Sequence, residues 1–354
     1  MSELIRPEIK ALSAYHVPDS GNLIKLDAME NPYSLPDDLR QLWLDELATV
    51  VLNRYPDPSA RALRNQLAAY MEVPDGHEIL LGNGSDELIQ IMAMAVAQPG
   101  KKILAPEPGF VMYKMIATFV GMDYIGVPLN DDFSLNLDAM LVAIQQHQPA
   151  LIFLAYPNNP TGNLFDGEAI EAIIKTAKGL VVIDEAYQPF ACTSFMSRLS
   201  DFDNLLVMRT VSKMGLAGLR LGLLAGRAKW LQEFDKLRLP YNINVLTQSS
   251  AKFALQHVDV FEKQAELIRD QREWLFNELS HLQDVTVYPS RANFILLKLM
   301  EADTNQVFAQ LKAAGILIKN LNPAGGLLAS CLRITVGTPE ENQAFLAAFR
   351  NILA

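Results

Sequence analysis

Short apolar segments alternate with amphipathic stretches between residues 78 and 226, and this alternation constrains the fold more than any other feature of the chain. Helix-like stretches at residues 85–97 and 166–178 separate several of the apolar segments. Short strands of this kind are typical of a mostly parallel sheet covered by helices on both faces. The region therefore predicts an α/β fold. The segments are EILLG, KKILAP, YIGVPL, ALIFLAYP, GLVVIDEA, NLLVMRTVS and LGLLAG.

The pattern changes after the segment KLRLPYNIN, which contains Pro240. A long helical stretch follows over about residues 246–282, and then the strand-like segments NFILLKL, ILIKNL and LRITVG precede a last helix at 339–353. This order predicts a second, smaller α+β domain, and 354 residues at roughly 150 residues per domain agree with two domains. We expect an N-terminal arm over 1–30 that packs with the small domain, a large domain over 31–245 and a small domain over 246–354.

The charge balance limits the partners of the chain. Asp and Glu outnumber Lys and Arg by 40 to 30, which gives a formal net charge of −10. Nucleic acids and anionic membranes select for clustered basic residues, so we expect neither as a partner. The apolar runs are far shorter than the ~20 residues that cross a bilayer. The first fifteen residues carry charges and no long apolar run, so we expect no targeting segment.

The chain has two cysteines, Cys192 and Cys331, which excludes a disulfide framework and favours a reducing cytoplasm. The five histidines show no metal-ligand spacing. We therefore expect no metal site.

A glycine-rich turn, Gly82-Asn83-Gly84, leads from a strand-like segment into a helix-like one. We expect Ser85 to cap this helix, whose first turn carries Asp86. The free N–H groups and positive dipole end of such a helix suit a phosphate. An ordinary capped helix fits the pattern as well.

Two asparagines, Asn158 and Asn159, follow an apolar segment that Pro157 ends. Ligands bind at the carboxyl ends of strands in open α/β sheets. The pattern therefore predicts a ligand contact, and a plain turn is the alternative.

Asp184 comes directly after the apolar run LVVI. A buried carboxylate is costly unless it meets a cation or hydrogen-bond donors. Asp184 is therefore expected either to face a cationic ring nitrogen or to cap a following helix.

Thr210, Ser212, Lys213 and Arg220 fall within eleven residues after another strand-like segment. Two cations and two hydroxyls can form an anion site, and a partly desolvated lysine becomes a nucleophile toward carbonyls. Solvated surface cations are the alternative reading.

Arg333 lies inside the apolar segment CLRITVG. A guanidinium binds carboxylate or phosphate with two parallel hydrogen bonds. A surface arginine on an edge strand is the other interpretation.

Taken in order, the fragments GNGSDE, NNPTG, DEAY, TVSK with a downstream arginine, and LRITVGTPEEN resemble the fold-type I aminotransferases that use pyridoxal 5′-phosphate. The resemblance covers essentially the whole chain. Tyr15, the stretch DAMENPY, the pair NRYP and the C-terminal RITVGTPEEN are most similar to the histidinol-phosphate aminotransferases of histidine biosynthesis. The resemblance implies a large α/β domain with a mostly parallel sheet and a smaller α+β domain.

The resemblance also implies the residues that bind the cofactor. Lys213 would form a Schiff base with pyridoxal 5′-phosphate, and Asp184 would pair with its pyridine nitrogen. Phe110 would stack on the ring, and Tyr187 and Asn159 would hydrogen-bond the 3′ oxygen. The residues expected at the cofactor phosphate are Gly84, Ser85, Thr210, Ser212 and Arg220, with Asp86 also in the cofactor site.

The implied reaction interconverts histidinol phosphate and 2-oxoglutarate with imidazole acetol phosphate and glutamate. Arg333 would bind the substrate anion, and Tyr55 would reach the cofactor phosphate of the neighbouring subunit, which implies a homodimer with shared active sites. Tyr15, Asn31, Asn159 and Lys319 complete the expected substrate site.

Two positions depart from the pattern of the family. Lys213 and Arg220 are seven residues apart, where many relatives have eight. Lys319 stands where many relatives carry arginine, and a lysine keeps the charge without the bidentate geometry.

Three other functions remain open at this point. An aromatic or broad-range aminotransferase and a decarboxylase of a phosphorylated amino acid would use the same cofactor. A ligand-sensing regulator that reuses the fold would need a DNA-binding module, which the acidic charge disfavours.

Overall fold

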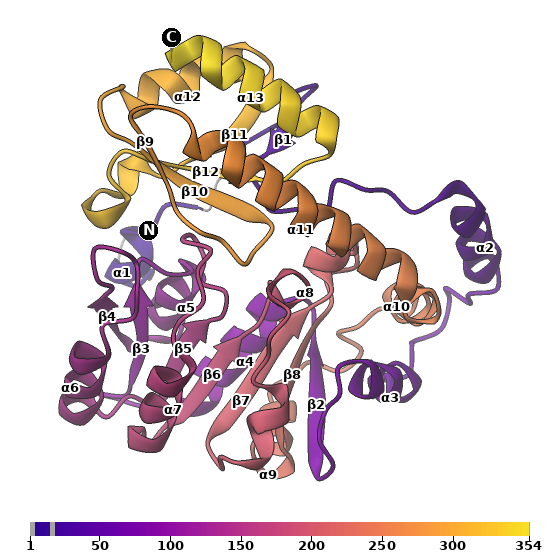
Figure 1. Ribbon diagram of the computed structural model, residues 1–354. Coiled ribbons are helices and arrows are strands. Elements are labelled where there is room, and N and C mark those ends of the chain that lie inside the picture. Colours follow the sequence, from indigo (N-terminus) through magenta and orange to yellow (C-terminus); the bar gives the residue numbers. More distant parts are fainter. Residues whose placement is uncertain (1–3, 15–17, 354) are drawn as a thin grey trace.

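The computed structural model describes residues 4–14 and 18–353, which form two sheets with helices packed around them (Figure 1). The larger sheet has seven strands in the order β2-β8-β7-β6-β5-β3-β4. Strands β4, β3, β5, β6 and β7 are parallel, and β8 is antiparallel to both of its neighbours. The strands are β2 (His77–Gly82), β3 (Lys102–Glu107), β4 (Asp123–Pro128), β5 (Leu151–Ala155), β6 (Leu180–Asp184), β7 (Leu205–Thr210) and β8 (Gly222–Arg227).

Helices cover both faces of this sheet. Apolar residues of α4, α5 and α9 form one core with one face. Residues of α3, α6, α7 and α10 form a second core with the other. All five residues of β5 and of β6 are buried, as expected for central strands with two covered faces. These helices are α3 (Arg61–Tyr70), α4 (Ser85–Val96), α5 (Met112–Val120), α6 (Leu137–His147), α7 (Gly167–Thr176), α9 (Ala228–Asp235) and α10 (Val245–Gln256).

The smaller sheet has five strands in the order β1-β11-β12-β10-β9, and all pairs except β1 with β11 are antiparallel. Helices α11, α12 and α13 pack on it, and α11 runs from this sheet toward α10 (Figure 1). The strands are β1 (Ile24–Leu26), β9 (Val285–Val287), β10 (Phe294–Leu299), β11 (Ile316–Asn320) and β12 (Cys331–Thr335). The remaining helices are α1 (Pro7–Lys10), α2 (Asp37–Ala48), α8 (Gln188–Ala191), α11 (Val258–Ser280), α12 (Thr304–Ala313) and α13 (Pro339–Leu353).

The expected α/β fold with a smaller α+β part is confirmed. The three segments expected as strands near the C-terminus, NFILLKL, ILIKNL and LRITVG, form β10, β11 and β12. The sequence did not reveal β1 and β9, which are three residues long and too short for a periodic pattern.

The N-terminal segment contacts both parts of the molecule, whereas we expected it to pack with the small domain. Its strand β1 joins the small sheet, but Arg6 donates to the carbonyl oxygen of Phe119 at 2.6 Å, next to α1 and α5 (Figure 1). We also expected residues 246–256 of α10 to belong to the small domain, but Ala251 and Ala254 pack in a core of the large sheet. The exact domain limits remain predictions.

Candidate active site

The carboxyl ends of β5, β6 and β7 meet at a cavity of about 130 Å³ on the side of the small sheet. Parallel strands end at the same edge of a sheet, which is why residues far apart in the sequence gather there. The structure brings most of the predicted cofactor residues together at this cavity. Those that line it are Ser85, Asp86, Phe110, Asn159, Asp184, Tyr187, Thr210, Ser212, Lys213 and Arg220.

Lys213 lies in a short 3₁₀ turn, Ser212–Met214, directly after β7. Burial lowers the pKa of its amine to about 8, and the positive charge of Arg333 acts in the same direction. The Nζ atom lies 3.5 Å from the carbonyl oxygen of Ala28 and 5.6 Å from the ring centre of Tyr187. A buried amine with a lowered pKa is a nucleophile near neutral pH, so the alternative of a solvated surface lysine is wrong.

Asp184 is the last residue of β6 and is buried. Its Oδ2 accepts a 2.7 Å hydrogen bond from the hydroxyl of Tyr113, and its Oδ1 accepts one of 3.1 Å from the N–H of Ala186. Burial raises the pKa of Asp184 to about 6, against the opposing effect of these hydrogen bonds. The carboxyl group also lines the cavity, and neither of the two hydrogen-bond donors just described is a cation. A buried carboxylate in this position suits a positively charged ligand atom.

The start of α4 reaches the cavity and has features that could hold an anion there. The cap residue is Gly84, with φ of +87°, and Ser85 is the first residue of the helix, so the expectation that Ser85 caps α4 is wrong. A positive φ favours glycine. A Cβ atom on Gly84 would also lie only 2.7 Å from Nη2 of Arg220, so the absence of a side chain lets the guanidinium approach the helix start.

Two hydroxyls and a cation complete this anion site. The Thr210 hydroxyl donates to the Ser212 hydroxyl at 2.8 Å. The Arg220 guanidinium lies 3.8 Å from the carboxylate of Asp86, which leaves its other nitrogens for a ligand. The shorter spacing after Lys213 therefore still delivers Arg220 to the cavity.

Arg333 lies in β12 and is buried, so the interpretation as a surface arginine is wrong. Its Nη1 donates to Oδ1 of Asn159 at 2.6 Å, and its Nη2 donates to the carbonyl oxygen of Asp27 at 3.0 Å. The amide of Asn159 in turn donates to the Tyr187 hydroxyl at 3.1 Å. Asn159 thus connects Arg333 to the cavity that Lys213 lines.

Arg333 and Lys319 line a second, larger cavity of about 760 Å³. The two residues are directly opposite each other in the β11–β12 pair. Met29, Phe110 and Asn159 line both cavities, so the two are adjacent. Two neighbouring cations at the larger cavity fit an anionic substrate.

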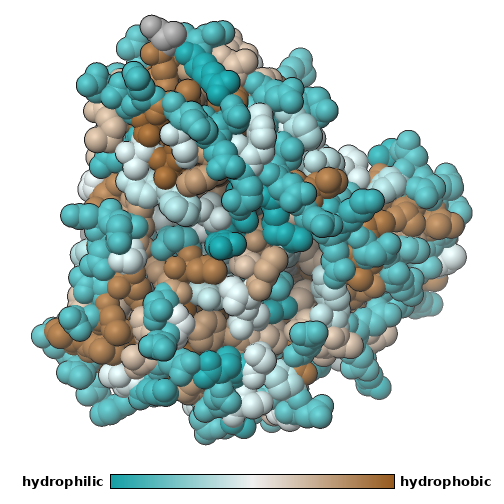
Figure 2. Space-filling model, viewed as in Figure 1, coloured by the Kyte–Doolittle hydropathy of each residue, from teal (hydrophilic) through white to brown (hydrophobic). Residues whose placement is uncertain are grey.

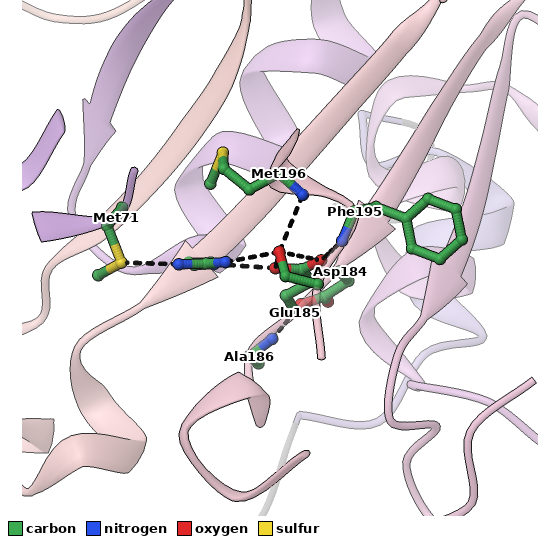
Figure 3. Close-up of polar contacts among 8 residues, drawn as sticks. Met71, Asp184, Glu185, Ala186, Phe195 and Met196 are labelled. Carbon is green, nitrogen blue, oxygen red and sulfur yellow. Dashed lines mark hydrogen bonds and ion pairs between the residues drawn. The ribbon is translucent and has the colours of Figure 1, made fainter. Parts of the chain in front are cut away.

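A buried ion pair joins the end of β6, next to Asp184, to β7 (Figure 3). Glu185 follows Asp184, Arg209 precedes Thr210, and Nε of Arg209 is 2.9 Å from Oε2 of Glu185. Glu185 also accepts from the Ser194 hydroxyl and from the N–H of Phe195. The ion pair cross-links β6 and β7 at their carboxyl ends.

Besides Gly84 at the start of α4, two described residues of the predicted site, Tyr55 and Asn31, line neither cavity. Tyr55 is 81% exposed and stacks on Tyr241 at 4.4 Å. The amide of Asn31 donates to the carbonyl oxygen of Met214 at 3.0 Å, so it holds the turn of Lys213. Tyr15 lies outside the described residues.

Among the residues of the site that sequence reasoning missed, Tyr113 and Met29 are in direct contact with predicted ones. Tyr113 contacts Asp184, and the only signal was its place three residues after Phe110 in PGFVMY. Met29, with φ of +55°, lines both cavities and belongs to the stretch DAMENPY. Neither residue type is chemically distinctive, so only the tertiary structure reveals them.

In the described part of the chain, no helix is long and apolar enough to cross a membrane. Within residues 4–14 and 18–353, no group of three or more His, Cys, Asp or Glu side chains could hold a metal ion.

Comparisons with known proteins show the family of the chain. The model of the family "Aminotransferase class I and II" matches residues 21–349. A protein of Cupriavidus pinatubonensis named histidinol-phosphate aminotransferase 2 is 56% identical over 354 residues, which cover 99% of this chain and 96% of that one. A protein of Nitrosococcus oceani with the same name is 54% identical over 350 residues, covering 99% and 97%.

Solved structures share the fold. Histidinol-phosphate aminotransferase from Sinorhizobium meliloti, in complex with pyridoxal 5′-phosphate, matches with a TM-score of 0.85 at 22% identity, covering 99% of each chain. The enzyme of the same name from Clostridium acetobutylicum matches with a TM-score of 0.85 at 23% identity, covering 93% of this chain and 99% of that one. The chain belongs to the class I and II aminotransferases, within the group of histidinol-phosphate aminotransferases.

Proposed function

We propose that the protein is a pyridoxal 5′-phosphate-dependent aminotransferase that interconverts histidinol phosphate and 2-oxoglutarate with imidazole acetol phosphate and glutamate. The observation that carries this proposal is that Lys213, Asp184 and the start of α4 line the same cavity. The adjoining cavity with Arg333 and Lys319 supplies the place for an anionic substrate.

The residues present fit the cofactor. Its phosphate would lie at the start of α4, where the glycine at position 84 leaves room beside Arg220. Phe110 would cover the ring, and Asp184 would face the ring nitrogen. When bound there, pyridoxal phosphate supplies an electron sink for the bond that breaks at the substrate carbon. Ser85, Thr210, Ser212, Asn159 and Tyr187 would provide further hydrogen bonds.

Lys213 would hold the cofactor and move the proton. Because the pKa of its amine is lowered to about 8, roughly a tenth of the amine is uncharged at pH 7, far more than for an ordinary lysine. An uncharged Nζ can take the proton from the amine-bearing carbon of the substrate. Asn31 would act as a positioning residue, since it bonds the residue that follows Lys213.

Arg333 would bind the substrate in both half-reactions. Glutamate presents an α-carboxylate and histidinol phosphate presents a phosphate, and a guanidinium can hold either anion. Arg333 is already held by Asn159 and by the backbone of Asp27, so its orientation is set before the substrate arrives. Lys319 would add a charge for the phosphate. Tyr15, which lies outside the described residues, remains a proposed substrate contact.

We also propose that the protein works as a homodimer in the cytoplasm, with Tyr55 reaching the partner's cofactor phosphate. Large apolar side chains are exposed around α2 and α10, among them Leu52, Tyr55, Leu239 and Tyr241, which are 70%, 81%, 73% and 39% exposed. Figure 2 shows hydrophobic residues on the part of the surface where Figure 1 places these helices. A second copy of the chain would bury this surface. The free thiols Cys192 and Cys331 are compatible with a reducing compartment.

The test is an assay of purified protein with glutamate and a panel of keto acceptors that includes imidazole acetol phosphate. We expect this acceptor to give the highest kcat/KM. A wide preference for an aromatic acceptor would refute the substrate assignment, and carbon dioxide release without 2-oxoglutarate would indicate a decarboxylase instead.

A second experiment tests the shared site. Mixed and re-associated Tyr55→Ala and Lys213→Ala subunits would place both native residues in one of the two sites of each hybrid. We expect partial recovery of activity relative to either variant alone, with the dimer verified by sedimentation. A dimer without recovery would contradict the role of Tyr55 across the interface.

A further inference from the structure

Tyr113 occupies the first turn of α5, behind the cavity that Lys213 and Asp184 line, and its side chain is 1% exposed. Its hydroxyl donates to Oδ2 of Asp184 at 2.7 Å. Its ring stacks on Phe153, with 4.6 Å between centres and 10° between planes. Its ring also meets Phe110 edge to face, with 5.4 Å between centres and 84° between planes. One side chain therefore contacts both the carboxylate and the aromatic ring that would hold the cofactor ring.

The direction of the hydrogen bond is fixed. Burial raises the pKa of the Tyr113 phenol well above its usual value, so the hydroxyl keeps its proton. The phenol must then donate and the carboxylate of Asp184 must accept. This bond favours the ionised form of Asp184 and opposes the effect of burial on its pKa.

A backbone hydrogen bond also holds Tyr113 next to Phe110. The N–H of Tyr113 donates to the carbonyl oxygen of Phe110 at 3.2 Å, in the turn that begins α5. Residues three apart in such a turn lie on the same side, which brings the two rings together. A phenylalanine at position 113 would fill the same space and keep the ring contacts, so packing alone does not account for the hydroxyl.

We propose that Tyr113 is a positioning residue, which orients the carboxylate of Asp184 through one hydrogen bond and the ring of Phe110 through one aromatic contact, and thereby sets the affinity and ring protonation of the bound cofactor. This inference rests on the proposed function, because it requires pyridoxal phosphate in the cavity. Loss of the hydroxyl makes the carboxylate of Asp184 a stronger base. The proton between it and the ring nitrogen then shifts toward the carboxylate.

The test compares wild-type protein with Tyr113→Phe, which removes one oxygen atom. The readouts are the dissociation constant of pyridoxal phosphate, from titration of the cofactor-free protein, and the ¹⁵N chemical shift of cofactor labelled at the ring nitrogen. We expect the dissociation constant to rise about tenfold or more, as for loss of a charged hydrogen bond. We expect the ¹⁵N shift to move toward that of the unprotonated ring, and kcat to fall with little change in KM for glutamate.

Phe153→Leu is the matched control, because it removes the stacking partner of Tyr113 and leaves the hydroxyl in place. We expect this variant to unfold at a lower temperature than wild type and to keep the wild-type ¹⁵N shift. If Phe153→Leu changed the shift as much as Tyr113→Phe, the effect would come from packing and the proposal would be wrong.

Two further outcomes separate this inference from the proposed function. If wild type binds the cofactor and Tyr113→Phe binds it with the same constant and the same ¹⁵N shift, the role of Tyr113 is refuted and the function stands. If the wild type binds no pyridoxal phosphate, the proposed function fails and the inference fails with it.

Discussion

The ion pair of Glu185 and Arg209 gives the sharpest stability prediction for this fold, because both partners are buried, at 1% and 6% exposure. In Glu185→Leu, the Arg209 guanidinium keeps its hydrogen bonds to the Ser194 hydroxyl at 2.7 Å and to the Met71 sulfur at 3.1 Å. Neither is an anion, so the buried charge loses its ion-pair partner. Breaking a buried pair from one side costs about 3–5 kcal/mol of unfolding free energy.

A double variant distinguishes an unpaired charge from lost packing. Glu185→Leu with Arg209→Met removes both charges and keeps apolar volume. We expect it to be less destabilised than the sum of the two single variants, by about 2 kcal/mol or more, because no charge is left unpaired.

The assay is urea unfolding of the cofactor-free protein at one protein concentration, followed by tryptophan fluorescence. The control is Glu171→Gln, which removes a carboxylate from a half-exposed ion pair with Arg198 and should destabilise the fold much less than Glu185→Leu does. A loss below about 1 kcal/mol for Glu185→Leu, or strict additivity in the double variant, would refute the reasoning. Because the pair ties β6 to β7, we also expect Glu185→Leu to weaken binding of pyridoxal phosphate.

Four further predictions concern the site itself. Lys213→Ala should lose several orders of magnitude in rate, and borohydride should no longer fix the cofactor to the protein, as peptide mapping would reveal. In the cofactor-free protein, burial raises the pKa of Asp184 from 3.8 to about 6, so its ionisation destabilises the fold as pH rises through this interval. Asp184→Asn should therefore be more stable than wild type at pH 8, by up to about 3 kcal/mol. In urea unfolding, this difference in stability should vanish toward pH 4. Arg333→Lys should slow both half-reactions at least about tenfold in single-turnover kinetics, because a lysine cannot form two parallel hydrogen bonds. Lys319→Ala should slow the histidinol-phosphate half-reaction more than the glutamate half-reaction, and equal effects would exclude a specific role at the phosphate.

Several local features could be predicted because each depends on residues that are close in sequence. The apolar runs that become β5 and β6 predict buried parallel strands, and Asp184 and Asn159 follow them at the end where ligands bind. The glycines before α4 and the hydroxyls around Lys213 predict an anion site for the same reason. Chain order and the family resemblance together therefore predicted most of the polar residues that line the cavity.

Other features depend on contacts between distant residues, and only the tertiary structure decided them. Tyr113 is an ordinary apolar-face residue in the sequence, and it becomes a partner of Asp184 because α5 packs against the end of β6, 71 residues further on. The sequence left open whether Arg333 lies at the surface. In the folded chain, the small sheet places it in contact with Asn159, which is 174 residues away.

The pKa values of the site residues also depend on the tertiary structure. The lowered pKa of Lys213 comes from burial and from Arg333, and neither can be read from the motif that contains the lysine. Sequence patterns encode periodicity and chain direction, which fix the strands and the edge at which they end. Burial and the distance between charges arise only when both sheets are assembled, and these set the chemistry of the site.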